Sequence, residues 1–101
     1  MNRAEVLDKA KDLISGARAK EYGPPKANFE RIAKMWSIIL KMDVTPAQVA
    51  LCMVQLKVTR LIETDDHTDS WVDMAGYAGC GSEVAEKNIQ SIGHWGIQTN
   101  E

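Results

Sequence analysis

The sequence predicts an all-α protein of four to five helices in a compact bundle around a central helix hairpin. Apolar residues recur at helical intervals of three and four in several segments, and a capping box opens one of them. No segment of useful length alternates between apolar and polar residues as a strand would. The 101 residues suit one domain. We expect residues 1–92 to form that domain and residues 93–101 to be a C-terminal tail.

Composition and charge exclude several classes of protein. A hydrophobic fraction of 45% is typical of a folded globular chain. A net charge of −2, from 12 basic and 14 acidic residues, gives no basic excess for duplex nucleic acid. No apolar run reaches the roughly 18 residues of a membrane span, and the N-terminal segment lacks the apolar core of a signal peptide. We therefore expect a cytoplasmic protein that contacts neither membrane nor duplex nucleic acid.

The first half of the chain predicts two helices with a proline turn between them. The first should span Arg3 to Lys20, and it ends before Pro24 and Pro25, which cannot continue a helix. The second should span Lys26 to Lys41. Its apolar stripe follows helical spacing closely and comprises Phe29, Ile32, Ala33, Trp36, Ile39 and Leu40.

The third predicted helix has the clearest start. Thr45 and Gln48 form a capping box around Pro46, which suits the first helical position. From residue 49 to residue 56 almost every side chain is apolar, and a helix that is apolar on all sides is buried on all sides. In so short a chain this predicts that a partner subunit covers one side, so we expect a homo-oligomer. Cys52 here, and Cys80 further on, are expected to be buried free thiols.

The fourth predicted helix begins near Asp69 and continues at least to Gly79. It carries three glycines between residues 76 and 81, each costing about 1 kcal/mol relative to alanine in a helix interior. We expect another backbone to pack closely against Gly76 and Gly79, and the helix to break or kink near Gly81. Residues 82–92 either extend this helix or form a short fifth one.

Four charged residues on the third and fourth helices are the first candidate site. Asp69 and Asp73 are four residues apart, so they share one helix face, and paired carboxylates can hold Mg²⁺. Lys57 and Arg60 share a face of the preceding helix, which a short loop makes an antiparallel neighbour. The bases either form a structural ion-pair cluster with the acids or bind phosphate, for which arginine offers a bidentate fork. Both arrangements are open, and both can hold: the bases would pair with the acids in the empty protein, and a bound ligand would reorganise these ion pairs.

The turn between the first two helices is the second candidate. Tyr22 is placed to stack on a base, Lys26 to meet a phosphate, and Asn28 to contact a base edge or sugar. The alternative is a plain interhelical turn with a partly buried tyrosine. In the loop before the fourth helix, His67 is either an acid–base group or a solvated side chain.

Several short motifs between about residues 15 and 80 together resemble a small uncharacterised domain family common in bacteriophage genomes. Singly none of them is specific. They are Arg18-x-x-x-Tyr22-Gly23, Asn28-Phe29-x-x-Ile32, Trp36, Thr45-Pro46-x-x-Val49-Ala50, Leu56-Lys57-x-x-Arg60-Leu61 and Asp69-Ser70-x-x-Asp73-x-x-Gly76-Tyr77-Ala78.

That family is in turn distantly similar to the MazG-type nucleoside triphosphate pyrophosphohydrolases, which are all-α oligomers. The resemblance implies that Mg²⁺ is held by two acidic motifs, E-x-x-E on one helix and E-x-x-D on the next. Only the second motif has a counterpart here, at Asp69 and Asp73. The first falls on the third helix, where Lys57 and Arg60 stand and Glu63 is the nearby acid.

Our first hypothesis is a phage-type helical protein that binds a nucleotide or a nucleotide-derived signal and sequesters it. The ligand would lie in a cavity of lysine, arginine and aspartate side chains, in the cytoplasm of the host cell if the protein is phage-encoded. Phosphates would face Lys57, Arg60 and Lys26, and a base would stack on Tyr22 or Tyr77.

Two alternatives stay open. In a Mg²⁺-dependent pyrophosphohydrolase, Asp69, Asp73 and Glu63 would hold the metal. Lys57 and Arg60 would then neutralise the charge that develops on the phosphate. The second alternative is an oligomeric adaptor that binds only protein.

Overall fold

The computed structural model describes residues 1–16 and 23–86, and in those residues it contains four α-helices and no strand. They are α1 (Arg3–Ser15), α3 (Pro25–Leu40), α4 (Pro46–Glu63) and α5 (Thr68–Glu86). This confirms the all-α prediction for the described part of the chain. The end of the first predicted helix, the residues beyond 86 and the predicted tail lie outside the described residues.

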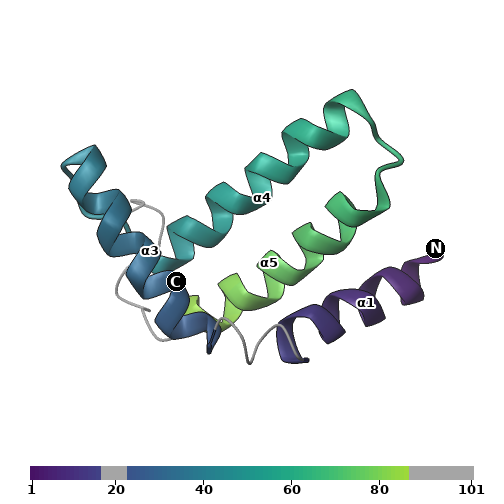
Figure 1. Ribbon diagram of the computed structural model, residues 1–101, viewed down its shortest axis with the longest axis horizontal. Helices are drawn as coiled ribbons and strands as arrows, with labels where there is room; N and C mark the ends of the chain where they lie inside the picture. Colours follow the sequence, from purple (N-terminus) through teal and green to yellow (C-terminus); the bar gives the residue numbers. More distant parts are fainter. Residues whose placement is uncertain (17–22, 87–101) are drawn as a thin grey trace, which may run out of the picture.

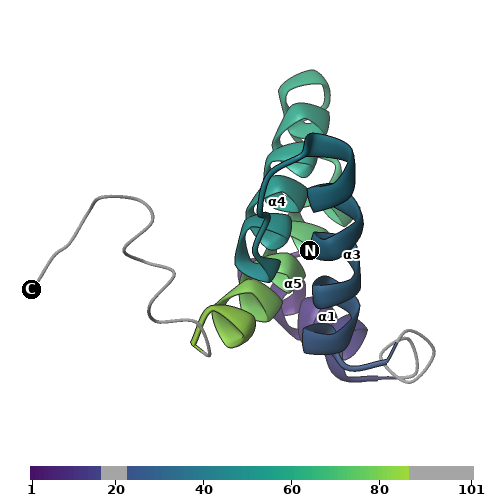
Figure 2. The same cartoon turned by 90° about the vertical axis from the view of Figure 1, so that its left-hand side faces the viewer.

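An antiparallel hairpin of α4 and α5 forms the centre of the molecule, as predicted (Figure 1). A short loop of residues 64–67 joins the two helices. Helix α1 lies alongside α5, and α3 crosses the end of the hairpin where α4 begins and α5 ends (Figures 1 and 2). All four helices contribute side chains to one hydrophobic cluster, with Ile14 of α1 packed against the buried residues of α3, α4 and α5.

Local signals in the sequence explain where the helices begin. The Thr45 hydroxyl accepts a hydrogen bond from the Gln48 backbone N–H at 3.1 Å, and the Gln48 side chain accepts one from the Thr45 N–H at 2.9 Å. The predicted capping box is thus confirmed. Helix α1 has an equivalent box between Asn2 and Glu5, which the sequence analysis missed. Helix α3 starts at Pro25, one residue earlier than predicted.

The glycines of α5 allow neighbouring helices to approach. The predicted break near Gly81 is wrong, because α5 continues through it to Glu86. A Cβ atom at Gly81 would lie 2.9 Å from the Cβ of Ala50, so the missing side chain lets α4 and α5 cross closely. Close packing at Gly76 is confirmed, since a Cβ there would lie 3.3 Å from Ile14. The neighbour is a side chain of α1, however, and not a backbone.

The core lies where α3 crosses the hairpin. Its buried residues are Phe29, Ala33, Val49, Ala50, Cys80 and Val84. Trp36 packs against this cluster, as predicted. Ile39 and Leu40, expected in the same stripe, are exposed because the end of α3 extends past the core.

Helix α4 is not buried on all sides within one chain. Leu51, Leu56 and Ile62 are exposed, with Ile62 retaining 80% of its accessible surface. Cys52 is exposed as well, so the prediction of a buried thiol is wrong there and confirmed for Cys80. The partner subunit expected over this face stays a prediction. Among the described residues no helix is both long and apolar enough to cross a membrane.

Candidate functional site

A cavity of about 410 Å³ opens between the four helices. Its walls are mainly apolar, with Leu13 and Ile14 contributed by α1, Phe29 by α3 and Val72 by α5. Four polar side chains also line it, namely Asn28, Lys57, Asp73 and Tyr77. All four are residues that the sequence had singled out as candidates.

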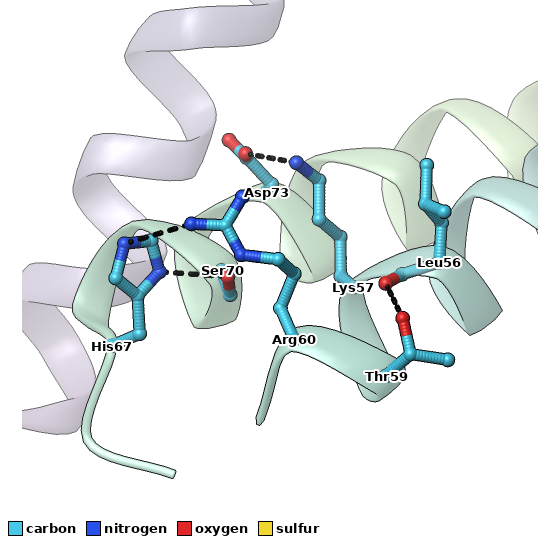
Figure 3. A network of polar contacts seen from close by, with 7 residues as sticks. All are labelled: Leu56, Lys57, Thr59, Arg60, His67, Ser70 and Asp73. Atoms are coloured by element: carbon cyan, nitrogen blue, oxygen red, sulfur yellow. Dashed lines mark hydrogen bonds and ion pairs between the residues drawn. The ribbon is translucent and has the colours of Figure 1, made fainter. Parts of the chain in front are cut away.

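Lys57 and Asp73 form an ion pair across the α4–α5 hairpin (Figure 3). The lysine Nζ lies 3.1 Å from the aspartate Oδ2, and the two side chains retain 19% and 34% of their accessible surface. The pair is thus partly withdrawn from water. The predicted opposition of a base on the third helix and an acid on the fourth holds for these two residues.

Arg60 lies on the same helix as Lys57 but makes different contacts. Its Nη2 lies 3.4 Å from the Nε2 of His67, and the Nδ1 of His67 lies 2.8 Å from the hydroxyl of Ser70 (Figure 3). A guanidinium can only donate hydrogen bonds, so a bond from Arg60 fits the tautomer in which Nε2 accepts and Nδ1–H donates to Ser70. Ser70 is only 1% exposed, so this bond satisfies a buried hydroxyl. Arg60 thus binds the start of α5 and does not line the cavity.

The acids predicted to hold a metal have different surroundings. Asp73 pairs with Lys57, whereas Asp69 and Glu63 are exposed and do not line the cavity. Within residues 1–16 and 23–86, no three His, Cys, Asp or Glu side chains are placed to share a metal ion. Mg²⁺ is commonly held by one or two carboxylates together with water and substrate phosphate, so magnesium binding by these acids stays a prediction.

The predicted site on the proline turn is only partly assembled. Asn28 lines the cavity from the first turn of α3. Lys26 points elsewhere and pairs with Glu30 at 3.4 Å on the surface of the same helix. Tyr22 lies outside the described residues, so of the two tyrosines proposed to stack on a base only Tyr77 is described at the cavity.

Sequence reasoning missed the contribution of α1 to the cavity. Leu13 and Ile14 were recognisable as an apolar stripe, but nothing local showed that they would face a cavity. Cys80 was also missed as a lining residue. Burial, and next the negative charge of Glu83, raises the pKa of its thiol, so at neutral pH Cys80 is protonated. It therefore contributes an apolar surface and not a nucleophile.

The fold and the cavity define a small all-α domain with a partly buried ion pair at an interhelical pocket. The chain belongs to the family described as domain of unknown function DUF6378, whose sequence pattern matches residues 5–85. This match confirms the predicted likeness to an uncharacterised bacteriophage domain family, because the relatives of this chain include phage proteins. No solved structure matches the chain.

Two such relatives carry the name Gene 55 protein. The one from Mycobacterium phage D29 is 40% identical over 85 residues, covering 84% of this chain and 56% of the relative. The one from Mycobacterium phage L5 is 44% identical over 75 residues, covering 73% of this chain and 48% of the relative. The chain thus spans about half the length of these relatives.

Proposed function

We propose that this domain binds a nucleotide-derived small molecule in the cavity between α1, α3, α4 and α5. The observation that carries the proposal is the convergence of Asn28, Lys57, Asp73 and Tyr77 on one cavity with apolar walls. Ligand sites are commonly concave, mainly apolar and supplied with a few polar groups, with volumes of about 300–1,000 Å³. The cavity volume of about 410 Å³ lies within that range.

Three of the four polar residues suit a part of a nucleoside. The ring of Tyr77 offers a face on which a base can stack, and the apolar wall at Phe29 continues that surface. The Asn28 amide both donates and accepts hydrogen bonds, as a base edge requires. Lys57 supplies donors for a base carbonyl, a ribose hydroxyl or a phosphate.

We propose binding without hydrolysis. The MazG-type enzymes hold Mg²⁺ with acidic motifs on two consecutive helices, and here Lys57 and Arg60 stand where the first motif would fall. The described residues also offer no group of three His, Cys, Asp or Glu side chains placed to share a metal ion, and this favours binding over hydrolysis. Asp73, the acid nearest the cavity interior, already pairs with Lys57. Binding alone would make the protein a sequestering module, and the phage origin of the relatives favours the cytoplasm of an infected cell as its place of action.

A thermal-shift screen of nucleosides, nucleotides and cyclic nucleotides, with and without Mg²⁺, tests the proposal. A ligand present at about 100 times its Kd should stabilise the protein by about 2.7 kcal/mol. Tyr77→Leu, which keeps apolar volume but removes the ring and hydroxyl, should abolish the shift. Lys26→Met changes an ion-paired lysine outside the cavity and should leave the shift unchanged.

Chromatography of each hit after incubation separates binding from turnover. Intact ligand supports the proposal, whereas released pyrophosphate would favour the hydrolase. If no probe raises the melting temperature, nucleotide binding is rejected and the protein-binding adaptor becomes the better hypothesis.

A further inference from the structure

We infer, on the basis of the proposed function, that the ligand is an uncharged nucleoside or nucleobase recognised by an intact Lys57–Asp73 pair, and not a polyphosphate. This narrows the class of ligand that the cavity selects. Two features support it, namely the charges that line the cavity and the hydrogen-bonding groups that the ion pair leaves available.

The described residues that line the cavity are balanced in charge. Lys57 and Asp73 are the charged side chains among the described residues that line it, and they are 3.1 Å apart. A terminal phosphate carries about −1.5 to −2 charges at neutral pH. If it bound Lys57 it would come to lie beside the Asp73 carboxylate, and like charges repel strongly in a site partly withdrawn from water.

The two other cations that had been proposed to meet phosphates are directed elsewhere. Arg60 contacts His67 at the start of α5, and Lys26 pairs with Glu30 on the surface of α3. Neither side chain lines the cavity. The described residues therefore bring one cation to the ligand, and its charge is already compensated.

The intact pair still offers hydrogen bonds to a neutral group. An ammonium has three N–H donors and a carboxylate has two acceptor oxygens, so the Lys57–Asp73 contact leaves donors on one side and acceptors on the other. A base edge with an adjacent carbonyl and amino group, or the two hydroxyls of a ribose, matches this arrangement. The Asn28 amide, on another helix, likewise has an N–H donor beside a carbonyl acceptor.

Calorimetric titration with four nucleosides (adenosine, guanosine, cytidine and uridine) and their 5′-mono-, di- and triphosphates tests the inference at low and high salt. One nucleoside should bind at least as tightly as its phosphorylated forms, with an affinity that barely changes with salt, because no net charge is neutralised. An affinity that rises about tenfold with each phosphate and falls with salt would overturn the inference and leave the proposed function standing. If none of these probes binds, and the free nucleobases do not bind either, the inference is wrong. The proposed function is rejected as well when the wider thermal-shift screen gives no hit.

Two variants examine the pair itself. Asp73→Asn removes the anion while keeping the shape, so nucleoside affinity should fall about tenfold and triphosphate affinity should rise. Lys57→Met should weaken the binding of nucleoside and of triphosphate. The matched control Lys26→Met should change neither affinity. If Asp73→Asn leaves the preference between nucleoside and triphosphate unchanged, the pair does not select the ligand and the inference is wrong. Should a variant not fold, the wild-type ligand series decides alone.

Discussion

The contact between Gly81 of α5 and Ala50 of α4 sets how closely the central hairpin packs. Gly81→Ala places a Cβ atom 2.9 Å from the Cβ of Ala50, which is 3% exposed. A Cβ atom is fixed to the backbone and cannot rotate away from Ala50, so α4 and α5 must shift apart. Gly79→Ala is the matched control, because a Cβ there lies at an ordinary 3.6 Å from the Ile14 side chain.

Both substitutions should gain helix propensity, but only Gly81→Ala should overpack the contact between the helices. Replacing glycine by alanine inside a helix stabilises it by about 1 kcal/mol. Gly79→Ala should show this gain. Overpacking a well-filled core costs about 1–3 kcal/mol. Gly81→Ala should therefore range from unchanged to about 2 kcal/mol less stable.

Urea and thermal unfolding of the two variants measure the difference. A change of 1 kcal/mol corresponds to roughly 4–8 °C in Tm for a domain of this size. Gly79→Ala should melt above the wild type and Gly81→Ala at or below it. In the double variant with Ala50→Gly, the overpacking cost should disappear. If Gly81→Ala stabilises the protein as much as Gly79→Ala does, α4 and α5 do not pack closely at Gly81 and Ala50.

Four further predictions concern the two thiols, a helix cap and self-association. Because burial and then Glu83 raise the pKa of Cys80, the unfolded thiol ionises first, so stability should fall above about pH 8.5 and Cys80→Ala should reduce that fall. The exposed Cys52 should react with a maleimide much faster than Cys80, and equal rates would contradict the assigned burial. Thr45→Ala removes the cap of α4 and should cost about 1 kcal/mol in urea unfolding, a loss that an unchanged midpoint would disprove. The exposed apolar face of α4 predicts a homo-oligomer by light scattering, which Ile62→Glu should dissociate; a monomeric wild type would contradict it.

Features that depend on neighbouring residues were predictable from the sequence. The start of α4 follows from Thr45, Pro46 and Gln48, which lie within one turn and satisfy each other's hydrogen bonds. The Lys57–Asp73 pair follows from helical spacing and a short loop, which together fix the faces that meet across a hairpin.

Features that depend on distant residues were not predictable. Helix α5 continues through Gly81, where it packs closely against Ala50, about 30 residues earlier, although helix propensity alone predicts a break there. Arg60 lies one turn from Lys57, yet it binds His67, because the loop before α5 brings the imidazole within reach. Spacing along one helix could not distinguish these two bases.

The central claim is that a ligand occupies the cavity between the four helices. A ¹H–¹⁵N NMR titration of the full chain with the tightest-binding nucleoside tests it most directly. The largest shifts should occur at residues that line the cavity, including Asn28, Asp73 and Tyr77. Shifts confined to the exposed face of α4, at Leu51 and Ile62, would contradict the account.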